Sequence, residues 1–133
     1  IAVALDWGLI VPVLKKADEK SLVGISKGIA DLAERARTKK LSPDDVQDGT
    51  FTITNPGVFG SLFGTPIISQ PQVAILGVGT IEKRVCVVND MIAIRPKGYL
   101  AISYDHRLID GAIADQFMVV VKKSIENFEE ALL

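Results

Sequence analysis

Residues that build covalent cross-links and metal sites are scarce in this sequence of 133 residues, which contains one cysteine and one histidine. The lone thiol of Cys86 excludes an internal disulfide, and Cys86 together with His106 cannot assemble a zinc site from the usual ligands. We therefore expect no metal in this protein. Cys86 is interpreted as a buried strand residue.

An excess of charge and membrane-length hydrophobic runs are also missing. Fifteen basic residues nearly balance sixteen acidic residues, which gives a net charge of -1. Such a chain has no broad positive electrostatic potential to attract nucleic acid or an anionic membrane. The apolar runs fall short of the roughly 20 residues that a membrane span needs, and no basic-then-apolar leader is visible. We expect a soluble intracellular protein with neither nucleic acid nor a membrane as its partner.

Two motifs for covalent or dinucleotide chemistry are absent as well. No Gly-x-Ser-x-Gly segment is present, so the sequence offers no nucleophile elbow for an acyl-serine intermediate. Gly77 and Gly79 have the spacing that begins a dinucleotide-binding loop, but Glu82 occupies the place of the third glycine and no helical pattern follows. We therefore reject a dinucleotide site.

Hydrophobic residues are plentiful, at 48% of the sequence, which is high for one domain of this size. Part of this apolar surface is expected to meet another subunit. Apolar residues at three- and four-residue intervals predict an amphipathic helix over 21–39 and a second helix over 111–126, with Asp110 as its N-cap. Residues 117–121 are continuously apolar, which predicts that this turn is covered on more than one side.

Shorter apolar segments predict the strands. Their ranges are 1–5, 9–14, 50–54, 73–88, 91–94 and 100–104. Pro12 indicates that the second strand is an edge or is interrupted, and residues 89–90 fit a hairpin turn. Residues 42–45 predict a capped turn, and residues 55–64, rich in glycine and aromatic side chains, predict a structured loop that lines a site.

The histidine lies where a strand pattern gives way to a helix pattern. His106 follows the predicted strand 100–104 and precedes Asp110. Imidazole can take and return a proton near neutral pH, so a histidine on such a fixed connection suits a general base. An ordinary surface histidine remains the alternative from these residues alone.

The segment around His106 also carries a family motif. Residues 105–111 read Asp-His-Arg-Leu-Ile-Asp-Gly and resemble the His-x-x-x-Asp-Gly signature of the dihydrolipoamide acyltransferases, the core subunits of 2-oxo acid dehydrogenase complexes, and of the related chloramphenicol acetyltransferase. The resemblance continues through residues 8–13, 51–60 and 65–77, so it covers nearly the whole chain. Asp105 stands where related enzymes often have a second histidine, as is common in the dihydrolipoamide branch.

The resemblance implies an α/β two-layer sandwich, with a mixed sheet and helices on one face. Residues 1–133 then form the C-terminal portion of the acyltransferase catalytic domain, and the N-terminal part of that domain is expected to be missing because Ile1 opens directly into a strand. No lysine lies in a recognisable lipoylation hairpin, so the lipoyl group would come from a domain absent from this chain.

The resemblance also implies acyl transfer between dihydrolipoamide and coenzyme A, which is a substrate. His106 would be the general base, and Thr54 would stabilise the oxyanion. Asp110 corresponds to the aspartate that shapes the site, although a helix cap alone explains this residue. Phe63 and Gly111 would contact the substrate, with Gly111 allowing a close turn of the backbone.

The family forms homotrimers that build larger hollow cores, and these associate with 2-oxo acid dehydrogenase and dihydrolipoamide dehydrogenase components. The expected compartment is the bacterial cytoplasm or the mitochondrial matrix. Residues 57–62 look closest to succinyl-transferring members, but acetyl and branched-chain transfer stay open. Two alternatives remain: a truncated, catalytically incompetent assembly scaffold, and a peptide-synthetase condensation domain, which shares the histidine motif but is much longer.

Overall fold

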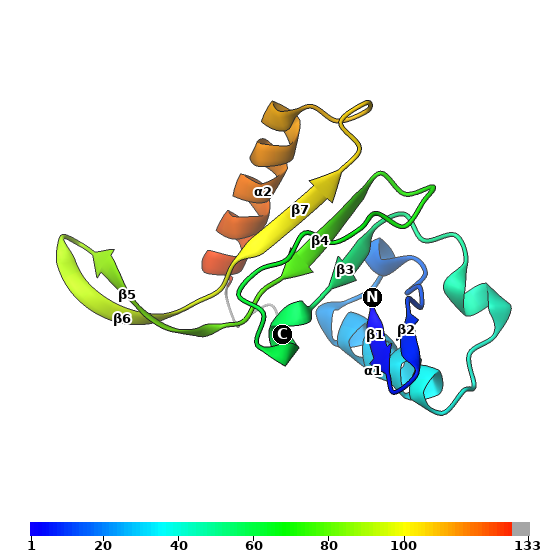
Figure 1. The fold of residues 1–133 in the computed structure, drawn as a ribbon. Coiled ribbons are helices and arrows are strands. Elements are labelled where there is room, and N and C mark those ends of the chain that lie inside the picture. Colours follow the sequence, from blue (N-terminus) through cyan, green and yellow to red (C-terminus); the bar gives the residue numbers. More distant parts are fainter. Residues whose placement is uncertain (129–133) are drawn as a thin grey trace.

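The computed structural model describes residues 1–128. The strands are β1 (Val3–Leu5), β2 (Gly8–Ile10), β3 (Thr52–Thr54), β4 (Ala74–Val78), β5 (Glu82–Val88), β6 (Met91–Lys97) and β7 (Leu100–Tyr104). The helices are α1 (Leu22–Arg37) and α2 (Gly111–Glu126), with short 3-10 helices η1 (Ala17–Glu19), η2 (Pro43–Val46) and η3 (Pro56–Phe59). Figure 1 shows their arrangement.

The central sheet has the strand order β3-β4-β7, with β3 parallel and β7 antiparallel to β4. Helix α2 runs back along β7 on one face of this sheet (Figure 1). The middle strand is buried on both faces, with Ala74, Ile75 and Leu76 exposed by 8% or less, which explains its uninterrupted apolar sequence. The expectation of an α/β fold with a mixed sheet is confirmed.

The β-rich segment predicted over 73–88 forms two strands, because the chain leaves the central sheet after Val78 and pairs again only from Glu82. The break lies at Gly79, where a Cβ atom would be 1.9 Å from the carbonyl oxygen of Leu62. β5 and β6 instead form a separate two-stranded hairpin that extends away from the rest of the molecule (Figure 1).

The hairpin confirms the predicted turn at residues 89–90. Asn89 and Asp90 have φ values of 50° and 60°, the left-handed pair that a tight two-residue hairpin needs. Cys86 is half-buried rather than buried, which corrects the sequence-based interpretation. β5 pairs only with β6, outside the central sheet, so this hairpin buries neither of its faces completely. The neighbours of Cys86 in the strand, Val85 and Val87, are 71% and 73% exposed.

The N-terminal part forms a small hairpin of β1 and β2 beside α1. The second strand is shorter than predicted and ends at Ile10, two residues before Pro12, which has no N–H for a strand ladder. Helix α1 matches its prediction closely: the Ser21 hydroxyl accepts a hydrogen bond from the Gly24 N–H at 3.2 Å. Leu32, on the inner face of α1, is 5% exposed.

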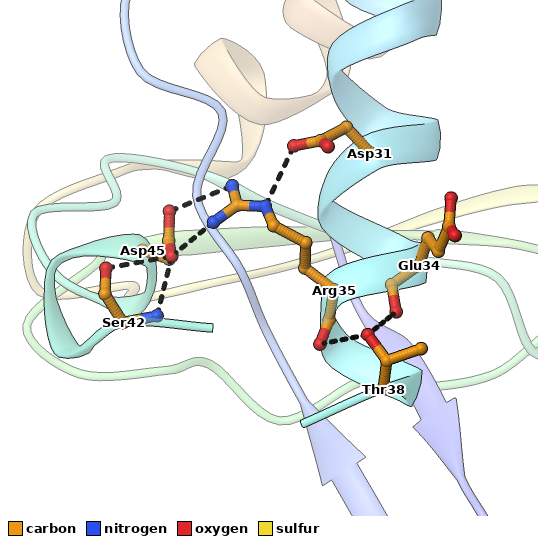
Figure 2. A network of polar contacts seen from close by, with 6 residues as sticks. All are labelled: Asp31, Glu34, Arg35, Thr38, Ser42 and Asp45. Carbon is orange, nitrogen blue, oxygen red and sulfur yellow. Dashed lines mark hydrogen bonds and ion pairs between the residues drawn. The ribbon is translucent and has the colours of Figure 1, made fainter. Parts of the chain in front are cut away.

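A polar network fixes α1 to the following turn (Figure 2). The guanidinium of Arg35 donates to both carboxylate oxygens of Asp45, at 2.7 and 3.1 Å, and to Asp31 at 2.9 Å. The carboxylate of Asp45 also accepts from the backbone N–H and hydroxyl of Ser42, at 2.8 and 2.9 Å, which caps η2 as predicted. These hydrogen bonds, led by that from Arg35, lower the pKa of Asp45 to about 2.

Helix α2 begins as predicted, with the Asp110 carboxylate accepting from the Ile113 N–H at 2.9 Å. The apolar turn over 117–121 is covered only in part by the described chain. Met118 and Val121 are half-buried, whereas Val119 and Val120 are 49% and 62% exposed. The predicted cover on more than one side is therefore not supplied by residues 1–128.

Candidate functional site

His106 lies on the connection between β7 and α2, as the sequence predicts. The Asp105 N–H donates to the Val73 carbonyl at 2.8 Å, which ties the start of the connection to the sheet. The Asp105 carbonyl accepts from the N–H groups of Leu108 and Ile109, each at 3.0 Å, which closes a tight turn around His106. The imidazole is exposed and its ring centroid lies 5.6 Å from that of Tyr104. A substrate can therefore reach a histidine whose backbone is firmly held.

The residues on either side of His106 form an ion pair that sequence reasoning missed. The guanidinium of Arg107 donates to Asp105 at 2.9 Å through Nε and at 2.6 Å through a terminal nitrogen, and the Arg107 backbone N–H donates to Oδ1 at 3.0 Å. These hydrogen bonds lower the pKa of Asp105 to about 2 and raise that of Arg107. In a turn, a spacing of two residues does not indicate that two side chains are in contact. Only the three-dimensional fold therefore reveals this ion pair.

Gly111 is not required by the geometry of this chain. A Cβ atom there would lie 3.7 Å from the Tyr104 hydroxyl, an ordinary contact, and Gly111 does not have the left-handed φ found at Gly60. The expectation that Gly111 allows a close backbone turn is therefore wrong within the chain. A role for Gly111 in contacting substrate stays a prediction.

Thr54 lies at the carboxyl end of β3, directly before the glycine-rich loop. Thr54 is half-buried and borders a cavity of about 720 Å³. The cavity lies between the N-terminal hairpin, α1 and the start of the loop, and its lining includes Leu32, Arg37 and Val58. Thr54 thus borders space that a small molecule or another chain could fill.

The loop after β3 is held by close backbone packing. A Cβ atom on Gly57 would lie 2.2 Å from the Gly79 carbonyl carbon, and the Thr80 N–H donates to the Ser61 carbonyl at 2.8 Å. Sequence reasoning missed this pairing of glycines, since nothing in their spacing links residues 57 and 79.

Phe63 lies on the same loop but does not line the cavity beside Thr54. Its ring is 6.4 Å from that of Tyr99, and the guanidinium of Arg84 lies 5.5 Å from the Tyr99 ring. Phe63 is 58% exposed at the base of the β5–β6 hairpin. Its predicted contact with substrate would therefore be made outside this cavity.

The chain does not bring Thr54 and His106 together. In the sheet, Thr54 pairs with Gly77 and Gly77 with Ala101, whereas Tyr104 pairs with Ala74 at the other end. Three residue steps along β7 correspond to about 10 Å, and His106 lies beyond them. Figure 1 shows the same separation: the connection from β7 to α2 and the 3-10 helix after β3 lie at opposite ends of the sheet.

Two further features of residues 1–128 bear on the site. The described residues contain no group of three or more His, Cys, Asp or Glu side chains arranged to hold a metal ion. Neither of the helices in that part of the chain is long and apolar enough to cross a membrane.

The family model for the catalytic domain of 2-oxoacid dehydrogenase acyltransferases matches residues 1–133. The chain is 53% identical to the dihydrolipoyllysine-residue succinyltransferase component of the 2-oxoglutarate dehydrogenase complex of Bartonella vinsonii subsp. berkhoffii. That match covers 100% of this chain and 32% of the relative, so the chain spans about a third of the relative's length. Similar proteins come from bacteria and, by name, from mitochondria.

Solved structures agree with this match. The chain superposes on the dihydrolipoamide acetyltransferase of Azotobacter vinelandii with a TM-score of 0.92 and 39% identity, over 99% of this chain and 54% of that one. A serine, a histidine and an asparagine of that enzyme have been investigated for their role in its catalytic mechanism. A truncated catalytic core of the 2-oxoacid dehydrogenase multienzyme complex of Thermoplasma acidophilum gives a TM-score of 0.85 and 52% identity, over 95% and 55% of the two chains.

Proposed function

This chain belongs to the family of 2-oxoacid dehydrogenase acyltransferase catalytic domains, and we propose that it supplies the histidine and threonine of a succinyl-transferring active site. The reaction exchanges an acyl group between the thiol of dihydrolipoamide and that of coenzyme A. One observation carries the assignment of residues. The separations along the chain between Thr54, His106 and Asp110 equal those between the serine, histidine and asparagine investigated in the Azotobacter enzyme.

In this proposal His106 acts as the general base. A thiol near neutral pH is mostly protonated, and only the thiolate is a strong nucleophile. His106 removes the thiol proton as the sulfur attacks the thioester carbonyl, and it returns the proton to the departing thiol when the intermediate collapses. Proton transfer of this kind contributes about 10²- to 10⁴-fold to the rate. The exposed imidazole on a fixed turn supports this role.

The tetrahedral intermediate carries an oxyanion, and we assign its stabilisation to the hydroxyl of Thr54. A threonine can donate the same O–H hydrogen bond as the serine of the Azotobacter enzyme. Removing one such donor costs on the order of 10²- to 10³-fold in turnover. Asp110 caps α2 through the Ile113 N–H and thereby shapes the site beside His106. Phe63 and Gly111 remain candidates for contacts to the substrate.

The distance between Thr54 and His106 supports a site shared by two subunits. A base at the attacking sulfur and a donor at the carbonyl oxygen must each come within about 3 Å of adjoining atoms. Two residues at opposite ends of one sheet do not meet that requirement. We therefore propose that each site takes His106 from one subunit and Thr54 from its neighbour, in a homotrimer that builds a larger core. The apolar residues of α2 that are exposed to solvent in this chain would be buried in such an assembly.

Succinyl is the proposed acyl group because relatives that are 53% and 49% identical to this chain are named succinyltransferase components of 2-oxoglutarate dehydrogenase complexes. In such a complex the lipoyl group comes from a separate domain, coenzyme A is the second substrate, and the 2-oxo acid dehydrogenase and dihydrolipoamide dehydrogenase are the other components. The names of its relatives favour the bacterial cytoplasm or the mitochondrial matrix as the compartment.

The proposal is tested in the full-length subunit with succinyl-CoA and dihydrolipoamide as substrates. His106→Ala is expected to lower turnover by about 10²- to 10⁴-fold while the melting temperature stays nearly unchanged. Lys27→Ala, an exposed residue of α1 that does not line the cavity beside Thr54, serves as the control and should keep normal turnover. A folded His106→Ala subunit with near-normal turnover would refute the catalytic role. A wild-type subunit that assembles but never turns over would favour the scaffold.

A further inference from the structure

The position of His106 depends on the backbone of its turn, because its imidazole is exposed and its ring rests only loosely beside Tyr104, with 5.6 Å between ring centroids. A general base must stay within hydrogen-bond reach of the proton that it removes. A misplacement of about 1 Å in an active site can cost as much as 10²-fold in rate. Whatever holds this turn therefore influences catalysis.

Asp105 makes most of the hydrogen bonds that hold the turn around His106. Its backbone N–H and carbonyl fix the turn to Val73 of the neighbouring segment and close it onto Leu108 and Ile109. Its side chain then accepts the N–H of Arg107 at 3.0 Å, so Asp105, directly before His106, is bonded to the backbone of the residues that follow His106. The peptide that carries the imidazole is clamped before and after the residue.

The side chain of Arg107 completes this clamp. Its Nε contacts both carboxylate oxygens of Asp105, at 2.9 and 3.2 Å, and a terminal nitrogen contacts one of them at 2.6 Å. The side chain of Asp105 is 20% exposed and that of Arg107 is 83% exposed, so the carboxylate faces inward under a guanidinium in solvent. Exposed ion pairs add little to stability, so this pair is better explained by the geometry that it imposes.

We propose that Asp105 and Arg107 are positioning residues, which hold the turn so that His106 is aimed at the reacting thiol. This inference rests on the proposed function of His106. The Oδ1 atom of Asp105 accepts from both the Arg107 N–H and Nε, and Oδ2 accepts from the guanidinium alone. Arg107 keeps the carboxylate in that orientation, and neither residue contacts the substrate.

The test compares Asp105→Ala, Asp105→Asn and Arg107→Met in the full-length subunit. Asp105→Ala removes both side-chain acceptors and is expected to lower kcat by about 10- to 100-fold, with the KM values for succinyl-CoA and dihydrolipoamide unchanged. Asp105→Asn keeps an acceptor oxygen for the Arg107 N–H and should recover most of the lost kcat. Arg107→Met leaves that backbone bond intact and should have an intermediate kcat.

Glu82→Ala is the matched control, because Glu82 and Arg84 form a second exposed acid–arginine pair two residues apart, far from His106 in the sequence. It should leave kcat unchanged. Wild-type kcat in Asp105→Ala would overturn the inference, as would a kcat loss in Asp105→Ala that matches a loss of folded protein by melting temperature. A folded, inactive His106→Ala beside a fully active Asp105→Ala refutes only the positioning role, whereas an active His106→Ala refutes the proposed function itself.

Discussion

Mixing two inactive variants of the full-length subunit tests whether Thr54 and His106 act on one substrate from different subunits. The variants are His106→Ala, which keeps Thr54, and Thr54→Ala, which keeps His106. Within one chain the two residues lie at opposite ends of the sheet, about 10 Å or more apart by the strand register. Each variant alone should therefore lack one half of every site.

The expected recovery follows from random assembly. If a site takes His106 from one subunit and Thr54 from the next, an equimolar mixture leaves about one quarter of the sites with both residues intact. Turnover should thus return to about a quarter of the wild-type value. The parents are expected to be about 10²-fold or more below wild type, so the increase is easily measured.

The assay is turnover of succinyl-CoA and dihydrolipoamide after the two variants are unfolded, mixed and refolded together. Mass spectrometry of intact oligomers verifies that mixed assemblies form. The control mixes His106→Ala with the double variant His106→Ala/Thr54→Ala, in which no site can regain both residues. Mixed oligomers as inactive as their parents would refute the shared site, and each subunit would then have to supply both groups.

Three further predictions concern the framework of the site. Asp110→Ala removes the cap on the Ile113 N–H and should lower the free energy of unfolding by about 1 kcal/mol together with activity, whereas Asp110→Asn keeps a capping oxygen and should keep stability in urea unfolding. Gly79→Ala forces a Cβ atom to within 1.9 Å of a backbone oxygen and should destabilise the subunit by about 2 kcal/mol or more, whereas Gly111→Ala meets only an ordinary contact and should melt normally. The pKa of Asp45 is lowered to about 2 from 3.8, so its carboxylate stabilises the fold above about pH 4 and loses this effect as the pH falls toward 2. Urea unfolding at pH 5 and pH 3 should show a smaller loss of stability in Arg35→Met than in wild type, and equal losses would contradict the role of that pair.

Local signals in the sequence determined much of the fold. The three- and four-residue spacing of apolar side chains predicted both helices, since a helix buries one face. Ser21 and Asp110 marked where they begin, because short polar side chains accept the free N–H groups of a first turn. Asn89 and Asp90 marked the hairpin, since both adopt positive φ more readily than most residues. The placement of His106 on a strand-to-helix connection followed from the same patterns.

Contacts between distant segments were decided by the tertiary structure alone. The strand register separates Thr54 from His106, and no spacing in the sequence states which residues pair across a sheet. Gly57 and Gly79 are needed because two backbones touch there, and Arg35 reaches Asp45 only after α1 and η2 are packed. Cys86 stays half-buried because its strand has a single partner. Sequence periodicity reports which face of an element is apolar, but what covers that face depends on how the elements are packed.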